Sequence, residues 1–270
     1  MKTENEWNWF ASGKHPVARD YIRIGRTDSL TNAISQWMEG GYRGTHPNRE
    51  RHPDRHSWRF WIKGAKRHLL ICGVVTDSCD SIGRTYPFVL MGNGPVDQWM
   101  LFWDLLPLAL ENTWKRIEHI LVQRFIDVQQ VEEGMRILPL PRNDWHALHQ
   151  RRLKRLKTTA DSLTKNIDSC RWREILKHKT GRSRITIPLK DPVIEKQEAQ
   201  VLSLLHQMKS LKQFIPTAVF IGGMPEVPQI VTFNRPLMQA DFIHLWAEVA
   251  QSDEPSCESL GVGYGNKKLT

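Results

Sequence analysis

A charged pair and a glycine come directly before an apolar run in the stretch DSCDSIGRTYPFVLM, which begins at Asp77. Asp77 and Asp80 are three residues apart, and two carboxylates can share acid–base work or can cap and brace a turn. Gly83 permits a tight turn, and the guanidinium of Arg84 pairs readily with a carboxylate. Because the acids are so close within a turn, bracing is favoured over catalysis, and we expect Arg84 to pair with Asp80 or Asp20.

The sequence lacks the motifs of common catalytic and nucleotide-binding sites. It contains no GxxxxGK[ST], no GxGxxG after a strand, no HExxH and no GxSxG. Two sets of histidines suggest a metal: His46, His52 and His56, and then the pair His146 and His149. Proline 53 opposes the helix that would align the first set, and the pair has no acidic ligand nearby. We therefore expect no enzyme activity, no metal and no cofactor.

The positive charge is concentrated in one part of the chain. The formal net charge is +9, and residues 141–190 hold 14 Lys and Arg against four Asp and Glu. Such a surplus indicates that the partner is an anionic protein surface or a nucleic acid, or that the segment is simply a solvated helix face. Side chains able to stack on bases are sparse there, namely Trp145 and Trp172, so nucleic-acid binding is the alternative hypothesis and not the first.

The remaining composition is that of a globular protein, and we expect it to be cytoplasmic. No apolar run of 18 residues is present, and the first residues, MKTENEWNWF, show no secretory pattern, so we expect no membrane insertion. The four cysteines form no CxxC pair. Eleven tryptophans are many for 270 residues; they either fill cores or form a flat aromatic surface for a protein partner.

The elements that must position Asp80 and Arg84 are predicted to form an antiparallel sheet. Alternation in SWRFWIKG predicts a strand with one buried face, made of Trp58, Phe60 and Ile62. Two further strands are predicted at 69–75 and 86–91, and the short connections favour an antiparallel meander. Apolar residues in 96–134 then follow a helical period, which Pro107 should kink or split.

The second half of the chain is predicted to be mixed α/β. We place an N-terminal domain at residues 1–136 and a C-terminal α/β region with the basic helical segment at 137–250. Residues 251–270 form a polar, glycine-rich tail that we expect to be disordered. The predicted fold class is α+β, with an antiparallel sheet flanked by helices.

Three blocks of the N-terminal half, taken in order, resemble a known family. The stretch WFASGKHPVARDYI is close to the pattern GKxPxxGDF through Trp9, Gly13, Lys14, Pro16 and Asp20. A strand with Trp58 and Phe60 follows, and then a pattern like DxxGRxxPL through Asp80, Gly83, Arg84 and Pro87. Together the blocks resemble the TagF family, also called ImpM, accessory proteins of bacterial type VI secretion systems. Arg19 stands where the family usually has glycine, and tyrosine 21 and phenylalanine 88 replace a phenylalanine and a leucine.

This resemblance implies regulation through protein–protein binding. TagF-like proteins act in the cytoplasm as post-translational repressors of type VI secretion, through the forkhead-associated scaffold protein, Fha. The resemblance also implies a longin- or profilin-like N-terminal fold. We expect the blocks around Lys14 and Arg84 to meet at one end of the sheet, where they first fix the fold and secondly form a binding edge. A sheet edge or aromatic surface near Trp7, Trp9 and Trp58 is the expected contact region.

Overall fold

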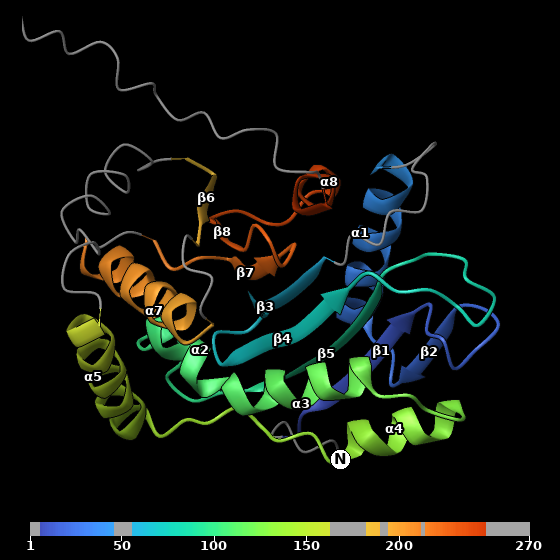
Figure 1. Ribbon diagram of the computed structural model, residues 1–270, viewed down its shortest axis with the longest axis horizontal. Helices are drawn as coiled ribbons and strands as arrows, with labels where there is room; N and C mark the ends of the chain where they lie inside the picture. The colour runs from blue at the N-terminus through green and yellow to red at the C-terminus, as the bar shows by residue number, and fades with distance from the viewer. Residues whose placement is uncertain (1–5, 46–55, 163–181, 190–193, 212–213, 247–270) are drawn as a thin grey trace, which may run out of the picture.

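One antiparallel sheet organises the molecule. The computed structural model describes residues 6–45, 56–162, 182–189, 194–211 and 214–246 (Figure 1). Within them, eight strands pair in the order β2-β1-β5-β4-β3-β7-β8-β6, and every pairing is antiparallel. Helices cover both faces (Figure 1). The predicted α+β class, a sheet flanked by helices, is confirmed.

The N-terminal half supplies five neighbouring strands. They are β1 (Asn8–Gly13), β2 (Ile22–Gly25), β3 (Ser57–Lys63), β4 (Leu69–Thr76) and β5 (Phe88–Pro95). Strands β3, β4 and β5 form the predicted meander. In β4 the residues from Leu70 to Val75 are buried on both faces, which is why their side chains are apolar without alternation.

Helices α1 (Ser29–Thr45) and α8 (Gln239–Trp246) lie side by side on one face of the sheet (Figure 1). Asp28 caps α1, because its carboxylate accepts hydrogen bonds from the backbone N–H groups of Leu30 and Thr31 at 3.0 and 2.8 Å. The core beneath these two helices combines aliphatic side chains with the aromatic residues Phe10, Trp58, Phe60, Phe220, Phe233 and Phe242.

The opposite face is covered by the remaining helices. They are the 3-10 turn η1 (Trp103–Leu105), α2 (Leu106–Ala109), α3 (Glu111–Val122), α4 (Val128–Arg136), α5 (Trp145–Ser162) and α7 (Ile194–Ser210). Pro107 lies in the first turn of α2, so the predicted break of the helical region near this residue is confirmed. The helices bury Trp61, Trp99 and Trp114 against the sheet.

Strand β3 departs from its prediction of one buried face. Trp58 and Phe60 point into the core under α1, as expected, but Trp61 on the opposite face is 0% exposed and contacts Trp99. The prediction is wrong because a second helical layer covers that face. Arg59 lies on the same face as Trp61 and reaches Glu118 of α3.

The C-terminal half continues the same sheet. Strand β7 (Ala218–Gly223) pairs with β3, and β8 (Gln229–Phe233) and β6 (Arg184–Pro188) follow outward. Both cores therefore contain residues from before and after position 136. The domain boundary at that position stays a prediction, and residues 251–270 lie outside the described residues.

Candidate functional site

The two loops that carry the TagF-like blocks meet at one end of the sheet. We call them the first signature loop, residues 14–21 between β1 and β2, and the second signature loop, residues 77–87 between β4 and β5. Arg84 donates from Nη2 to the carbonyl oxygen of Arg19 at 2.6 Å, and the N–H of Ser81 donates to the carbonyl oxygen of Ala18 at 2.8 Å. The β4–β5 connection reaches the end of β1 and β2 in Figure 1. The predicted meeting of the two blocks is confirmed.

Asp80 is the centre of this contact and is only 2% exposed. Its carboxylate accepts hydrogen bonds from the backbone N–H and the Nε of Arg84, at 2.8 and 2.7 Å, and pairs with Lys14 Nζ at 3.3 Å. Burial alone would raise the pKa of Asp80, but the hydrogen bonds from Arg84 and Lys14 outweigh it and lower the pKa to about 2. Asp80 is therefore an ionised anchor for both loops and is unsuited to carrying a proton at neutral pH.

The backbone conformation requires glycine at two positions of the blocks. Gly83 has φ of +82°, which closes the turn after Asp80. Gly13 has φ of +131°, and a Cβ on it would lie 2.1 Å from the carbonyl oxygen of Pro87, so the two blocks also touch through their backbones. Among the described residues, Gln98 is the one residue other than glycine that has a positive φ. Arg19 thus adopts an ordinary conformation where the family usually has glycine.

The outer surface of the loops is accessible to a partner. The side chains of Asp20 and Arg84 are 76% and 49% exposed, and they lie 3.4 Å apart. Ile82, at the tip of the second signature loop, is 57% exposed, and Pro16 of the first is exposed as well. One side of the cluster thus holds the fold through Asp80, while the other presents charged and apolar groups to solvent.

The aromatic residues of the blocks belong mainly to the interior. Trp58 and Phe60 are 0% and 2% exposed, and both β1 and β3 lie between other strands. The expectation of a sheet edge or aromatic surface that includes Trp58 is therefore wrong, because β2 and β7 cover these strands. Trp7 and Trp9 are half-buried and stack on each other with ring centroids 5.4 Å apart.

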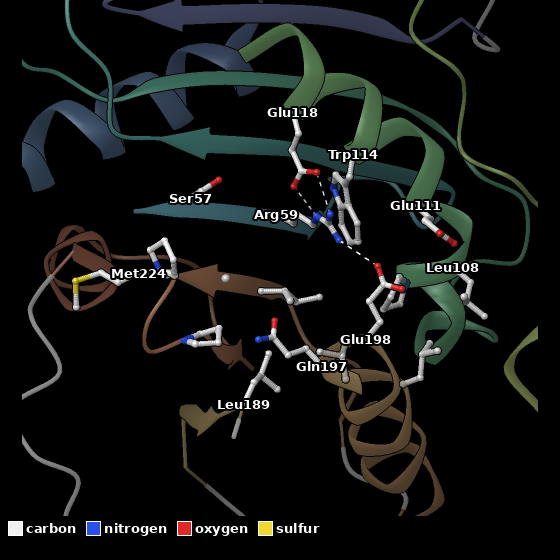
Figure 2. A pocket seen from close by; sticks show the side chains of 18 of the residues that line it. Ser57, Arg59, Leu108, Glu111, Trp114, Glu118, Leu189, Gln197, Glu198 and Met224 are labelled. Carbon is white, nitrogen blue, oxygen red and sulfur yellow. Dashed lines mark hydrogen bonds and ion pairs between the residues drawn. The ribbon is translucent and has the colours of Figure 1, made fainter. Parts of the chain in front are cut away.

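A cleft of about 450 Å³ lies between α3, α7 and the strands β3 and β7 (Figure 2). Its apolar lining includes Leu108, Trp114, Leu189, Val201, Leu202 and Ile221. Figure 2 shows Arg59 between Glu118 and Glu198. Its guanidinium binds Glu118 through two hydrogen bonds of 2.6 and 2.9 Å, and it approaches Glu198 at 3.8 Å. Arg59, Glu118 and Glu198 are thus engaged with one another.

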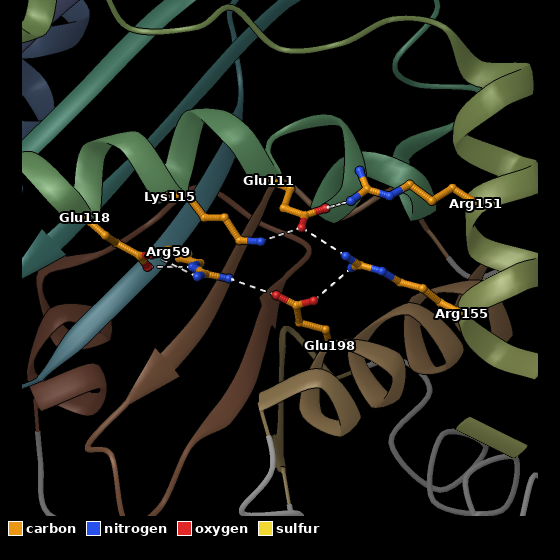
Figure 3. Close-up of polar contacts among 7 residues, drawn as sticks. All are labelled: Arg59, Glu111, Lys115, Glu118, Arg151, Arg155 and Glu198. Carbon is orange, nitrogen blue, oxygen red and sulfur yellow. Dashed lines mark hydrogen bonds and ion pairs between the residues drawn. The ribbon is translucent and has the colours of Figure 1, made fainter. Parts of the chain in front are cut away.

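The charges of the cleft continue into helix α5 (Figure 3). Arg155 bridges Glu198 and Glu111 at 2.8 and 2.9 Å, and Glu111 also pairs with Lys115 and Arg151 at 2.7 and 2.8 Å. Burial would raise the pKa of Glu111, but hydrogen bonds from Lys115 and Arg155 outweigh it and lower the pKa. We call this set the helix network: Arg59, Glu111, Lys115, Glu118, Arg151, Arg155 and Glu198. Each of its carboxylates faces at least one cation, which suits a structural junction better than proton transfer.

A second buried acid ties the same helices to η1. Asp104 is 2% exposed and pairs with Arg152 of α5 and with Lys209 and His206 of α7, the last two at 2.6 and 3.3 Å. Burial would raise the pKa of Asp104, but its bonds to His206 and Lys209 lower the pKa to about 2. No local pattern marks these residues as partners, because Asp104 lies 48 residues from Arg152 and 105 from Lys209.

Two of the histidines considered for a metal contact other side chains, and His146 is exposed on α5. His149 Nδ1 is 3.0 Å from Arg152 Nη2, and the buried His56 is bonded to Asp77 at 2.9 Å. His46 and His52 fall outside the described residues. Among those that are described, no group of three His, Cys, Asp or Glu side chains could hold a metal ion.

Comparison with known proteins identifies the region that holds both signature loops. Residues 10–137 match the family model described as "TagF N-terminal domain, Type VI secretion system-associated". Among solved structures the chain is similar to the crystal structure of PA0076 from Pseudomonas aeruginosa PAO1, with 19% identity, a TM-score of 0.41, and coverage of 51% of this chain and 64% of that one. The comparison with curated proteins gave no match, and no helix that the structure describes could cross a bilayer. This chain carries, over residues 10–137, the N-terminal domain of the type VI secretion system-associated TagF family.

Proposed function

We propose that this chain is an accessory regulator of a bacterial type VI secretion system. It acts in the cytoplasm as a post-translational repressor of apparatus assembly, by binding the forkhead-associated scaffold protein, Fha. The observation that carries the proposal is the TagF N-terminal domain at residues 10–137. The two signature loops of this domain are ordered around Asp80 and keep exposed groups at their tips, as a preformed binding edge requires.

A binding role fits the chemistry of the buried acids better than an enzymatic role does. Asp80, Asp104 and Glu111 each contact at least two cations, and their pKa values are lowered. A general acid or base works best with a pKa near the operating pH. These side chains therefore act as structural anions in the proposal, with no reaction assigned to them.

Nucleic-acid binding through the basic segment is less well supported than protein binding. The three arginines of α5, Arg151, Arg152 and Arg155, form ion pairs with acids of η1, α3 and α7. A cation that already neutralises a carboxylate contributes little to binding phosphate. Residues 163–181, which carry further basic side chains, lie outside the described residues.

The proposal is tested by binding between the purified chain and the Fha protein of the same system, measured by calorimetry. We expect the wild-type chain to bind, and an absence of binding between the purified components would overturn the proposal. Arg84→Ala separates the two roles of the second signature loop. A soluble, folded variant that no longer binds Fha would assign Arg84 to the contact edge, whereas loss of soluble protein would assign it first to bracing Asp80.

Arg136→Ala is the matched control for this variant. Arg136 pairs with Glu132 on the surface of α4, and the two side chains are 70% and 45% exposed. Removing it changes the net charge as Arg84→Ala does, but it leaves the signature loops intact. We expect its affinity for Fha to equal that of the wild type.

A further inference from the structure

The turn between α3 and α4 carries the two most exposed large apolar side chains in the described part of the chain. Val122, the last residue of α3, is 79% exposed, and Ile126 is 86% exposed. Single exposed apolar residues are common on protein surfaces. Two within five positions, at a turn with a fixed backbone, indicate a place where another molecule can bury them.

Hydrogen bonds hold this turn in place. Asp127 caps α4 by accepting from the N–H of Gln130 at 2.9 Å, and the side chain of Gln130 accepts from the N–H of Ile126 at 3.0 Å. An apolar residue just before an N-cap often packs on the residue five positions later, which here is Val131. Val131 is 0% exposed and lies in the core, whereas Ile126 projects into solvent. The backbone of Ile126 is thus preorganised, while its side chain does not pack against the core.

The same turn lies beside the first signature loop. The ring of His15 is 5.1 Å from that of Phe88 at the start of β5 and 6.1 Å from that of Phe125 in the turn. The α3–α4 turn and the β1–β2 connection are at the same end of the molecule in Figure 1. Contacts therefore join the α3–α4 turn to the first signature loop and the first loop to the second, so the outer sides of the three segments are neighbours.

The charge around this surface is positive. The segments 14–26, 77–87 and 122–127 contain six Lys and Arg residues against four Asp residues. The cations are Lys14, Arg19, Arg23, Arg26, Arg84 and Arg124. An apolar centre with a charged rim is the usual anatomy of a protein interface, and opposite charge on the partner speeds association. The fitting partner surface is an apolar pocket flanked by carboxylates.

We propose that Val122 and Ile126 form the apolar anchor by which this chain binds its protein partner, in an apolar pocket rimmed by Asp and Glu. The inference rests on the proposed function, because it specifies where Fha makes contact and with what chemistry. Binding buries two side chains on a backbone that is already held in place, so little backbone entropy is lost.

The test is the affinity of Fha for a Val122→Ser/Ile126→Ser double variant, with Leu101→Ser as the control. Leu101 is 64% exposed, and its carbonyl oxygen accepts from Lys209 of α7, away from the signature loops. We expect binding by the double variant to weaken at least about tenfold, as for the loss of a central anchor. The unfolding midpoint should stay unchanged because both side chains are exposed in the free protein. Leu101→Ser should bind as the wild type does.

The outcomes separate this inference from the proposed function. If the wild-type chain does not bind Fha, the proposed function falls and the inference falls with it. If the wild type binds and the double variant binds equally tightly, the inference alone is overturned. A wild-type affinity that does not weaken with increasing salt would contradict the acidic rim of the partner pocket.

Discussion

The signature-loop contact and the contacts of helix α5 are built from the same chemistry but differ in what they leave exposed. In both, a buried carboxylate is held by several cations: Asp80 by Lys14 and Arg84, and Asp104 by Arg152 and Lys209. The side chain of Arg84 is 49% exposed, whereas that of Arg152 is 5% exposed. The loops therefore brace the fold and still present a surface, while the α5 contacts are enclosed within it.

The two regions also connect different parts of the chain. The signature loops join segments within the TagF N-terminal domain. The helix network and Asp104 join α3 and η1 of that domain to α5 and α7. We infer from this difference that the positive charge of α5, which stands out in the sequence, serves mainly to attach the C-terminal half.

Asp104→Ala should have the largest effect on stability. It leaves Arg152 buried without its carboxylate, and breaking a buried pair from one side costs about 3–5 kcal/mol. The measurement is the free energy of unfolding from a denaturant titration. A loss below about 1 kcal/mol, the size of a surface ion pair, would show that the junction does not depend on Asp104.

Gly13→Ala should destabilise the protein more than Gly83→Ala does. Both glycines have positive φ, which costs other residues roughly 1–2 kcal/mol. A Cβ on Gly13 would also collide with backbone atoms of Pro87 and Phe88, whereas one on Gly83 would meet nothing within 4 Å. Thermal unfolding of the two variants side by side tests the order. Equal midpoints would mean that the two blocks do not touch as described.

Asp80→Asn should change how the free energy of unfolding depends on pH. The pKa of Asp80 is about 2 in the folded protein and about 3.9 in an unfolded chain, so the unfolded state binds more protons between these values. The stabilisation from Asp80 is therefore fully present above about pH 4 and is lost as the pH falls toward 2. The stability difference between wild type and Asp80→Asn should shrink over that window. A difference that is constant with pH would contradict the pairing.

Arg136→Ala should have the smallest effect. Its pair with Glu132 is exposed, and such pairs contribute about 0–1 kcal/mol. Raised salt should remove even this contribution, because exposed charges are screened. A loss of stability comparable to that of Asp104→Ala would break the distinction between exposed and enclosed pairs.

Local patterns predicted most of the elements, and the family resemblance predicted the meeting of the two blocks. The alternation in β3, the apolar run of β4 and the break at Pro107 each report a property of neighbouring residues, and such properties can be read from sequence. The meeting of the blocks around Lys14 and Arg84 was expected from the family resemblance and was confirmed, whereas the pair between Lys14 and Asp80 was not predicted. The second buried face of β3 was missed, because alternation at Arg59 and Lys63 hides the burial of Trp61 between them.

Contacts between distant elements could not be predicted in the same way. Arg59 meets Glu118 across 59 positions and Glu198 across a larger separation, and nothing local marks these residues as partners. The exposure of Ile126 was also unpredictable, because a residue before an N-cap is normally expected to pack on the helix. Both features depend on how the helices lie on the sheet.

Hydrogen–deuterium exchange of the chain with and without Fha tests the central claim most directly. The account predicts that Fha slows exchange in the two signature loops and in the α3–α4 turn, with no change in α5. Slower exchange in α5 or along the cleft, with none in the signature loops, would contradict it and would assign the partner surface to the C-terminal half.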